Sequence, residues 1–537
     1  MLIKYIKNGV KCSTFDSCKD FELEITKKYS RMSVTLIAKV DMDLVKAIDL
    51  LPIKTNHSGL YFFNGYQSWT DTKEYKLVDR LRDIKKSPHI ISHMFAMHAY
   101  GDNHFYKYSI KKSHGYDLFY SKGKYESFIY NLNFDVAYLI IEMIKDRRTT
   151  IRLTSDLKGL HLKAGESVKI FDYYYFPDFE EGLKSFYDHL PLLNKEKIFG
   201  YTSWYNYYQN ISEEIILRDL KALDDRFNLF QIDDGYETFV GDWFDVDPKK
   251  FPNGLEPIVK EIHSKGLKAG LWLAPFVAEK KSKLFKEHQD WFAKKNDKPI
   301  VAGGNWSGQY ALDLTNQEVK DYIAKSLRHY MDMGFDFFKL DFLYAAGLPD
   351  VKGKTRCQAQ KEAYEFLKEI LKGKQILGCG ANLINSFGSF DYLRIGPDVS
   401  LSFDDVGYMR LFHRERPSTK VTLQNTIYRS IFDQRLFAND PDVFLLRDDN
   451  IKLSFKQRIA LTKINALFGS VLMTSDNIAE YDDDKKKVLS EALNLFKNAT
   501  DKKYVKRGKY IDISYKLNNE QHSFTYNTKK GVLTNER

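Results

Sequence analysis

The feature that most constrains the fold is an alternation of short apolar runs with amphipathic segments, which begins near residue 197. Amphipathic stretches such as 316–334 and 358–373 separate most of the apolar runs. Alternation of strands and helices over roughly 250–280 residues is typical of a (β/α)₈ barrel. A doubly wound sheet alternates too, but no G-x-G-x-x-G follows the first run, which disfavours that fold. We therefore predict eight barrel strands, in residues 198–204, 227–233, 267–275, 335–342, 374–380, 390–396, 436–440 and 471–476.

The segments on either side of this alternation are typical of β structure. Before residue 185, short alternating or aromatic runs are separated by Gly, Asn, Asp and Lys, as expected for a sandwich. A helix is predicted over 177–195, and short strand patterns return near the end of the chain. The expected fold class is α/β plus all-β. The predicted domains are an N-terminal β-sandwich (1–185), a catalytic (β/α)₈ TIM barrel (186–489) and a small C-terminal β domain (490–537).

Charge and hydropathy argue against nucleic acid and membrane as partners. The net charge is +10, but the 82 basic residues are interleaved with 72 acidic ones, and no basic block stands apart. No stretch approaches the roughly 18 apolar residues of a membrane span. The four cysteines form no CxxC pair, and although Cys12 and Cys18 could pair, free thiols are expected. The N-terminus lacks the apolar run of a signal peptide, so we expect a cytoplasmic protein.

Carboxylate residues gather where the predicted strands end. In a barrel, the active site lies at the carboxyl ends of the strands. Histidines are few there, which excludes a histidine-rich metal site and a recognisable Ser/His/Asp triad. Carboxylates combined with Trp, Lys and Arg are what glycoside hydrolysis requires, because one acid attacks the sugar and another protonates the leaving oxygen. The strand-end acids are Asp233, Asp234, Asp341, Asp398, Asp440 and Asp476.

Asp341 ends the nearly all-apolar run FFKLDF, where an unpaired acid would be costly. Lys339 lies two residues earlier, so both side chains face the same side of the strand. An adjacent ammonium would keep Asp341 ionised, as a nucleophile must be. The alternative interpretation is a structural Lys–Asp pair at the strand end.

Asp398 follows the sixth run in the motif RIGPD and is the predicted general acid. An aspartate in a turn after Pro397 is the alternative interpretation. Asp404 and Asp405, in the motif SFDD, are rivals for the acid role. The pair Asp233 and Asp234, in QIDDG, predicts sugar binding, although adjacent aspartates before glycine also form turns and helix caps.

Six motifs in order resemble family 36 glycoside hydrolases, which are chiefly α-galactosidases and include a compact bacterial and archaeal type. They are QIDDGYE, GLWLAPF, YALDLT, FFKLDFLYAAG, ILGCG and RIGPD. GYQSW in the N-terminal region fits the same family, in which a Trp from that domain reaches the sugar. The resemblance implies the three predicted domains, release of terminal α-linked galactose with retention of configuration, and no cofactor. The segment VSLSFDDVGYMR departs from the family's pattern and leaves the aglycone preference open.

The resemblance also implies roles for individual residues. Asp341 matches the nucleophile, Asp398 the acid/base, and Asp233 and Asp234 residues that bind sugar hydroxyls; no metal ligand is implied. Related activities are α-N-acetylgalactosaminidase and galactosyl transfer of the raffinose or stachyose synthase kind, and a catalytically inactive carbohydrate-binding protein is the alternative from another class. The oligomeric state stays open, a homo-oligomer included. Further residues expected to contact an α-galactoside oligosaccharide are Trp69, Trp204, Tyr205, Trp272, Lys339, Cys379 and Arg394.

Overall fold

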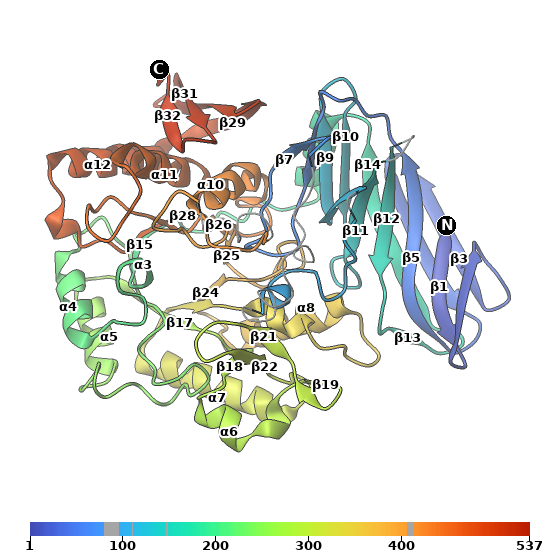
Figure 1. Cartoon of the computed structure of the whole chain (residues 1–537), viewed down its shortest axis with the longest axis horizontal. Coiled ribbons are helices and arrows are strands. Elements are labelled where there is room, and N and C mark those ends of the chain that lie inside the picture. The colour runs from blue at the N-terminus through green and yellow to red at the C-terminus, as the bar shows by residue number, and fades with distance from the viewer. Residues whose placement is uncertain (80–95, 110, 146–148, 405–412, 537) are drawn as a thin grey trace.

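The computed structural model describes residues 1–79, 96–109, 111–145, 149–404 and 413–536. Asp405, one of the rival acids, lies outside the described residues. Among the described residues, no helix combines the length and the apolar character needed to cross a bilayer. Figure 1 shows three parts: a barrel ringed by helices, a sandwich of long strands beside it, and a small sheet above α11 near the C-terminus.

A curled sheet of parallel strands forms the barrel, in the order β26-β25-β24-β23-β17-β16-β15-β28-β27. β26 pairs with β25 and β27 pairs with β28, so these two short segments act as one interrupted strand that closes the ring. Pro441, which has no N–H to donate, lies at the interruption. All eight predicted strand positions are confirmed. The strands are β15 (Ile198–Thr202), β16 (Leu229–Ile232), β17 (Lys268–Leu273), β23 (Phe337–Leu340), β24 (Gln375–Gly378), β25 (Tyr392–Arg394), β26 (Ala438–Asp440), β27 (Val443–Phe444) and β28 (Val471–Thr474).

Helices surround this ring, and their boundaries follow from local capping. Thr355 begins α8 with a capping box, and Gly334 ends α7 in the left-handed conformation that glycine tolerates. Between β24 and β25 the chain forms turns at residues 383–389 instead of a helix. The helices are α3 (Trp204–Tyr207), α4 (Glu213–Ala222), α5 (Glu256–Ser264), α6 (Lys283–Glu287), α7 (Gln317–Met333), α8 (Arg356–Ile370), α10 (Thr419–Tyr428), α11 (Phe455–Phe468) and α12 (Asp483–Asn498).

A small antiparallel excursion, which the sequence analysis did not predict, leaves the carboxyl end of β17 before the chain returns through α7. β18 (Val277–Glu279), β21 (Val301–Gly303) and β22 (Gln309–Ala311) form a three-stranded sheet in the order β18-β22-β21. β19 (Lys294–Lys295) and β20 (Lys298–Pro299) form a second, two-stranded hairpin. The excursion therefore places extra loops at the barrel end where functional residues are expected.

The N-terminal sandwich consists of two antiparallel sheets whose inner faces share one apolar core. One sheet contains β1 (Leu2–Lys7), β2 (Val10–Phe15), β5 (Met42–Pro52), β8 (Lys112–Tyr116), β11 (Leu139–Ile144), β12 (Thr150–Asp156) and β13 (His161–Leu162). The other contains β3 (Phe21–Lys28), β4 (Arg31–Ala38), β6 (Leu60–Phe63), β7 (Glu74–Lys76), β9 (Leu118–Lys122), β10 (Ser127–Asn131) and β14 (Ser167–Phe176). The predicted sandwich is confirmed.

The linking helix predicted over 177–195 is shorter in the structure, where α2 spans Phe179–Asp188. Asp178 caps it, because its carboxylate accepts from the N–H of Glu181 at 2.8 Å. At the other end, β29 (Thr500–Arg507), β30 (Tyr510–Leu517), β31 (Glu520–Asn527) and β32 (Val532–Thr534) form the small C-terminal sheet. The division into three domains stays a prediction, and its boundary between residues 489 and 490 lies inside α12.

Candidate active site

Lys339 and Asp233 form a buried ion pair at the carboxyl ends of β23 and β16. The Lys339 ammonium donates to Asp233 Oδ2 at 2.9 Å, and Thr202 (3.0 Å) and Gln231 (2.7 Å) donate to the same oxygen. Burial lowers the pKa of Lys339, but Asp233 more than offsets this and holds the ammonium charged. Lys339 therefore bonds Asp233, two strands away, and not Asp341, which disfavours the alternative of a structural Lys339–Asp341 pair. The expected influence of the Lys339 ammonium on Asp341 is electrostatic, since its charge lowers the pKa of that carboxyl.

Asp341 is held instead by an indole and by the backbone. Its Oδ2 accepts from Trp272 Nε1 at 3.1 Å, and its Oδ1 accepts from the N–H of Phe342 at 2.8 Å. Burial raises the pKa of Asp341, as does the charge of Asp398, while Lys339 and the Trp272 hydrogen bond lower it. Asp341 as a whole is only 8% exposed, so its carboxylate is largely shielded from solvent.

Arg394, the last residue of β25, joins three carboxylates that follow its own strand or lie at the end of the adjacent β26. Its guanidinium contacts Asp398 at 3.0 Å, Asp440 at 2.9 Å and Asp442 at 2.8 Å. The Asp398 side chain is 39% exposed, whereas Asp440 and Asp442 are buried. Burial, together with the charges of Asp398 and Asp440, raises the pKa of Asp442 to about 7, although Arg394 opposes the shift. Tyr205 donates its hydroxyl to Asp442, so this residue also joins the Arg394 cluster.

Trp69 reaches the barrel from the N-terminal part because a buried arginine holds the backbone of its loop. Arg429 donates to the carbonyl of Ser68 at 2.6 Å and to that of Ile395, directly after β25, at 2.8 Å. A Cβ at Gly380 would lie 3.2 Å from the Trp69 ring, so glycine permits this close approach. The Trp69 indole N–H is buried without a hydrogen-bond partner among the described residues.

Asp234 lies beside this group but is held by residues of other loops. Its Oδ1 accepts from Gln209 Nε2 at 3.1 Å, and its Oδ2 accepts from Trp306 Nε1 at 2.8 Å. Burial raises the pKa of Asp234, and the charge of Asp233 adds to the shift. Asp234 is therefore oriented by protein donors on both oxygens, and each oxygen retains a lone pair for a ligand.

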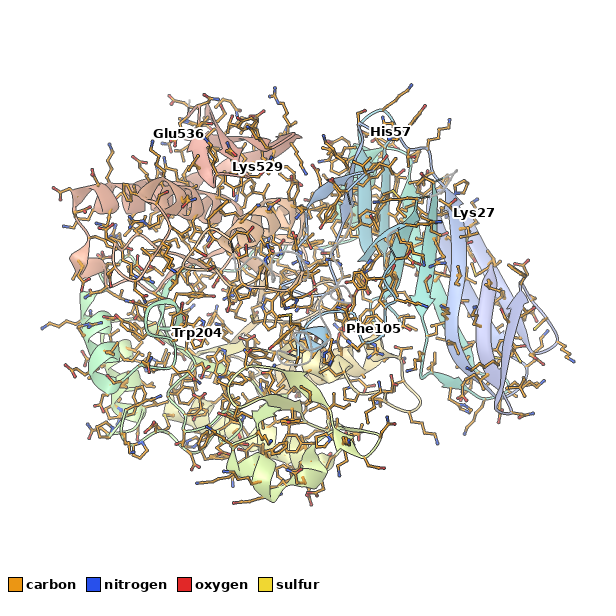
Figure 2. The ribbon with its side chains drawn as sticks, viewed as in Figure 1. Lys27, His57, Phe105, Trp204, Lys529 and Glu536 are labelled. Carbon is orange, nitrogen blue, oxygen red and sulfur yellow. The ribbon has the colours of Figure 1, made fainter. Side chains whose placement is uncertain are left out.

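The two remaining predicted residues lie at neighbouring strand ends. Cys379 follows β24 and is buried; its thiol favours the ionised form of Asp341. Trp204 is the first residue of α3, shortly after β15, and Figure 2 labels it in the barrel part of the molecule, away from the sandwich. Its ring packs edge-on against Tyr208 at 5.2 Å, so its contact with a sugar stays a prediction.

Comparison with known proteins shows which glycosidases this chain resembles. The sequence profile named Melibiase matches residues 197–371. Over 104 residues the chain is 38% identical to α-galactosidase 2 of Pediococcus pentosaceus. The aligned region covers 19% of this chain and 14% of that relative. The chain thus spans only a small part of that curated relative's length.

Solved structures match nearly the whole chain. The α-galactosidase TtGalA of Thermus thermophilus, in complex with stachyose, has a TM-score of 0.69 at 25% identity, covering 92% of this chain and 99% of TtGalA. The GH36 α-galactosidase AgaA of Geobacillus stearothermophilus has a TM-score of 0.60 at 13% identity, covering 94% of this chain and 74% of AgaA. The chain is therefore similar in sequence to α-galactosidases over part of its length and similar in fold to a GH36 enzyme over most of it. Its sandwich, barrel and C-terminal sheet are the fold shared with these structures.

Sequence reasoning missed two residues of this barrel. Asp442 follows Pro441, in the same Pro-Asp pattern that identified Asp398, so the motif NDPD could have revealed it. Trp306 lies in the loop GGNWSG between β21 and β22, which has no strand or helix period. Nothing in that loop's sequence indicates that it returns to Asp234.

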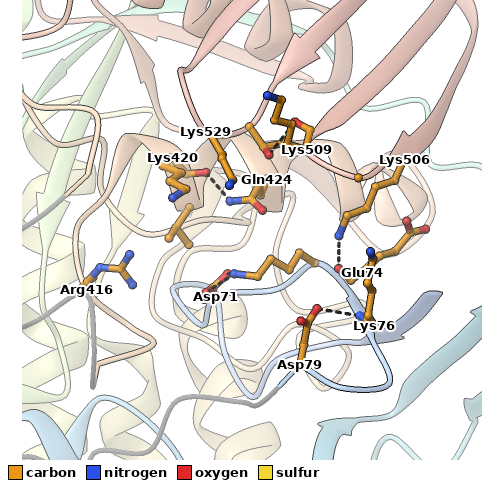
Figure 3. A pocket seen from close by; sticks show the side chains of 14 residues that line it. Asp71, Glu74, Lys76, Asp79, Arg416, Lys420, Gln424, Lys506, Lys509 and Lys529 are labelled. Carbon is orange, nitrogen blue, oxygen red and sulfur yellow. Dashed lines mark hydrogen bonds and ion pairs between the residues drawn. The ribbon is translucent and has the colours of Figure 1, made fainter. Parts of the chain in front are cut away.

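A cavity of about 660 Å³ lies away from the strand ends, where the β7 region, α10 and the C-terminal sheet meet (Figure 3). None of its lining residues is a predicted catalytic or sugar-binding residue. Ion pairs such as Lys73 with Asp71 at 2.7 Å occupy part of its wall. Because glycoside hydrolysis needs converging carboxylates, we place the candidate active site at the strand ends. The charged lining consists of Asp71, Lys73, Glu74, Lys76, Asp79, Arg416, Lys420, Lys506, Lys509 and Lys529.

Proposed function

We propose that the chain is a retaining α-galactosidase that releases terminal α-linked galactose from oligosaccharides or simple glycosides. The observation that carries the proposal is that two interacting carboxylates at one barrel end, Asp341 and Asp398, differ in exposure to solvent. Burial and the charge of Asp398 raise the pKa of Asp341, so the two groups lie within electrostatic range. Asp341 is 8% exposed, and the Asp398 side chain is 39% exposed. The relatives named as α-galactosidases support galactose as the sugar.

In the proposed reaction, Asp341 attacks the anomeric carbon while Asp398 donates a proton to the departing oxygen. The glycosidic bond breaks and a β-galactosyl ester forms on Asp341. Asp398, now a carboxylate, takes a proton from water as the water attacks the same carbon, which regenerates Asp341 and releases α-galactose. Two displacements give net retention, and this geometry requires the carboxyl groups to be about 5–5.5 Å apart.

Sugar recognition is proposed for the side chains around these two acids. The unpartnered Trp69 N–H supplies a donor, and Asp234 supplies acceptors for hydroxyls. The sides of the proposed sugar pocket are formed by aromatic rings and by one thiol, from Trp204, Tyr205, Trp272 and Cys379. The charged framework consists of two separate groups, Lys339 with Asp233 and Arg394 with its own carboxylates. Because these charges are already paired, we expect the sugar to be recognised mainly through hydrogen bonds.

Release of nitrophenol from an aryl α-D-galactoside by the purified protein tests the proposal. We expect steady turnover and α-galactose as the first product by NMR. If the protein instead hydrolyses an α-N-acetylgalactosaminide or another α-glycoside, the proposed substrate is wrong but the proposed mechanism still holds. Product analysis at high acceptor concentration separates a hydrolase from a galactosyl transferase, and the absence of turnover on any glycoside would favour a binding protein.

The pH profile should report the hydrogen bond between Trp272 and Asp341. The nucleophile acts as an anion, so kcat/KM falls as pH drops through its pKa. The Trp272 N–H stabilises the anion at 3.1 Å, so Trp272→Phe should raise that pKa further and move the acid limb to higher pH. A charge-assisted hydrogen bond corresponds to about one pH unit or somewhat more. An unmoved acid limb, measured from about pH 4 to 8, would contradict this role.

We also propose a cytoplasmic location. All four cysteines lie in the described part of the chain and all are free thiols. Proteins that keep several unpaired cysteines are typical of reducing compartments. Fractionation of the native host, with activity on the aryl galactoside as the readout, tests this location.

A further inference from the structure

The loop at residues 303–308 presents one tryptophan to the candidate site in an unusual backbone conformation. Trp306 has φ +52°, in the left-handed region that bulky residues seldom adopt. Such conformations persist when surrounding contacts fix them, and they are common at binding sites. Gly308, with φ +92°, turns the chain back into β22 immediately afterwards.

Two contacts from different parts of the chain fix this loop. The Tyr100 hydroxyl accepts from the N–H of Gly304 at 2.9 Å and donates to Asn305 Oδ1 at 2.8 Å. On the other side, the Ser307 hydroxyl donates to Glu279 Oε2 at 2.6 Å. Glu279 is a buried residue of β18. The position of Trp306 is therefore set from both sides.

The indole of Trp306 lies among the proposed catalytic groups. Its N–H donates to Asp234 Oδ2 at 2.8 Å. Its ring packs against Trp272 at 6.1 Å and against Phe342, the residue after Asp341, at 5.2 Å. Trp272 in turn donates to Asp341, so two adjacent indoles each hold one carboxylate. Trp272 is 2% exposed, whereas Trp306 remains partly exposed and can touch a ligand.

We propose that Trp306 is a specificity-determining residue that contacts the sugar, fixing Asp234 with its N–H and walling the pocket beside Asp341 with its ring. The inference rests on the proposed galactosidase function. A sugar hydroxyl that bonds Asp234 shares the carboxylate with Trp306, so the hydroxyl must approach from one direction. A sugar that lacks or misdirects that hydroxyl leaves a buried polar group unpaired and is rejected.

The hydroxyl that bonds Asp234 takes no part in the reaction, so we expect this contact to stabilise the ground state and the transition state alike. Loss of such an interaction raises KM and leaves kcat nearly unchanged. Trp306→Phe retains a ring but removes the N–H. We expect KM for an aryl α-D-galactoside to rise about tenfold, with kcat within threefold of wild type. The preference for the galactoside over its 6-deoxy analogue or its C4 epimer should fall in parallel.

Trp291→Phe is the matched control, because Trp291 Nε1 also donates to a carboxylate, Glu318 Oε2 at 2.9 Å, outside the site. It should change KM by less than twofold. Ser307→Ala removes the hydroxyl's bond to Glu279 and leaves only the weaker contact from the Ser307 N–H at 3.3 Å. It gives an independent route to a KM increase, expected to be about threefold. Thermal melting of each variant checks that it folds.

Kinetics of Trp306→Phe indistinguishable from those of Trp291→Phe would overturn the inference. So would a fall in kcat at constant KM, which would indicate a purely structural role. Failure of the proposed function looks different, since the wild type itself would then neither turn over an α-galactoside nor bind galactose in a calorimeter.

Discussion

Replacing Asp341 by glycine is expected to reduce hydrolysis of an aryl α-D-galactoside by roughly 10⁴-fold or more, because the covalent intermediate cannot form. The glycine leaves a space next to two donors, Trp272 Nε1 and the N–H of Phe342. Azide can occupy that space and attack the anomeric carbon from the side of the missing carboxylate. Activity should return with added azide, and the product should be β-galactosyl azide, identified by NMR.

Asp336 supplies the control, since it directly precedes the same strand, at the opposite end of the barrel. There it pairs with His263 at 2.8 Å and Lys374 at 3.3 Å. Asp336→Asn should lower stability but keep kcat within about threefold, because that face of a barrel serves stability. Substantial activity in Asp341→Gly, or an α-galactosyl azide from it, would show that another group is the nucleophile.

The position of Asp341 could be predicted because two general rules of strand and barrel geometry both apply to it. Side chains two residues apart share a face of a strand, and barrel chemistry gathers at the strands' carboxyl ends. These rules placed Lys339 on the correct face but could not identify its partner. That partner, Asp233, lies 106 residues earlier and follows β16, which is separated from β23 by β17, so only the barrel's strand order and register bring the two together.

The parts that the sequence did not reveal are those set by loops. Trp306 reaches Asp234 through a left-handed residue and through contacts with Tyr100 and Glu279, none of which has a local sequence signal. The connection between β24 and β25, for which no helix was predicted, is likewise a loop. Residues 383–389 form turns there, although the predicted strands on either side are correct. Periodicity predicts regular elements, whereas loop paths depend on long-range contacts.

Removal of the proposed acid should produce a loss that depends on the leaving group. In Asp398→Ala, an oligosaccharide substrate should lose roughly 10³-fold or more in kcat/KM, because a sugar oxygen departs poorly without a proton. Nitrophenolate leaves readily without a proton, so formation of the galactosyl-enzyme from a nitrophenyl galactoside should survive. Hydrolysis of the galactosyl-enzyme should slow, because it needs Asp398 as a base. A burst of nitrophenol should then precede a slow steady state. The variant should fold, because Arg394 keeps its contacts with Asp440 and Asp442.

Azide distinguishes this variant from Asp341→Gly by the anomer it forms. With Asp341 intact, azide attacks the galactosyl-enzyme and should give α-galactosyl azide. Asp404→Asn is the comparison, since Asp404 was the rival acid and its carboxylate instead contacts Arg416 at 2.7 Å and Ser418 at 2.9 Å. That variant should show the same proportional change on both substrates. A leaving-group-dependent loss in Asp404→Asn, with none in Asp398→Ala, would transfer the acid role to Asp404.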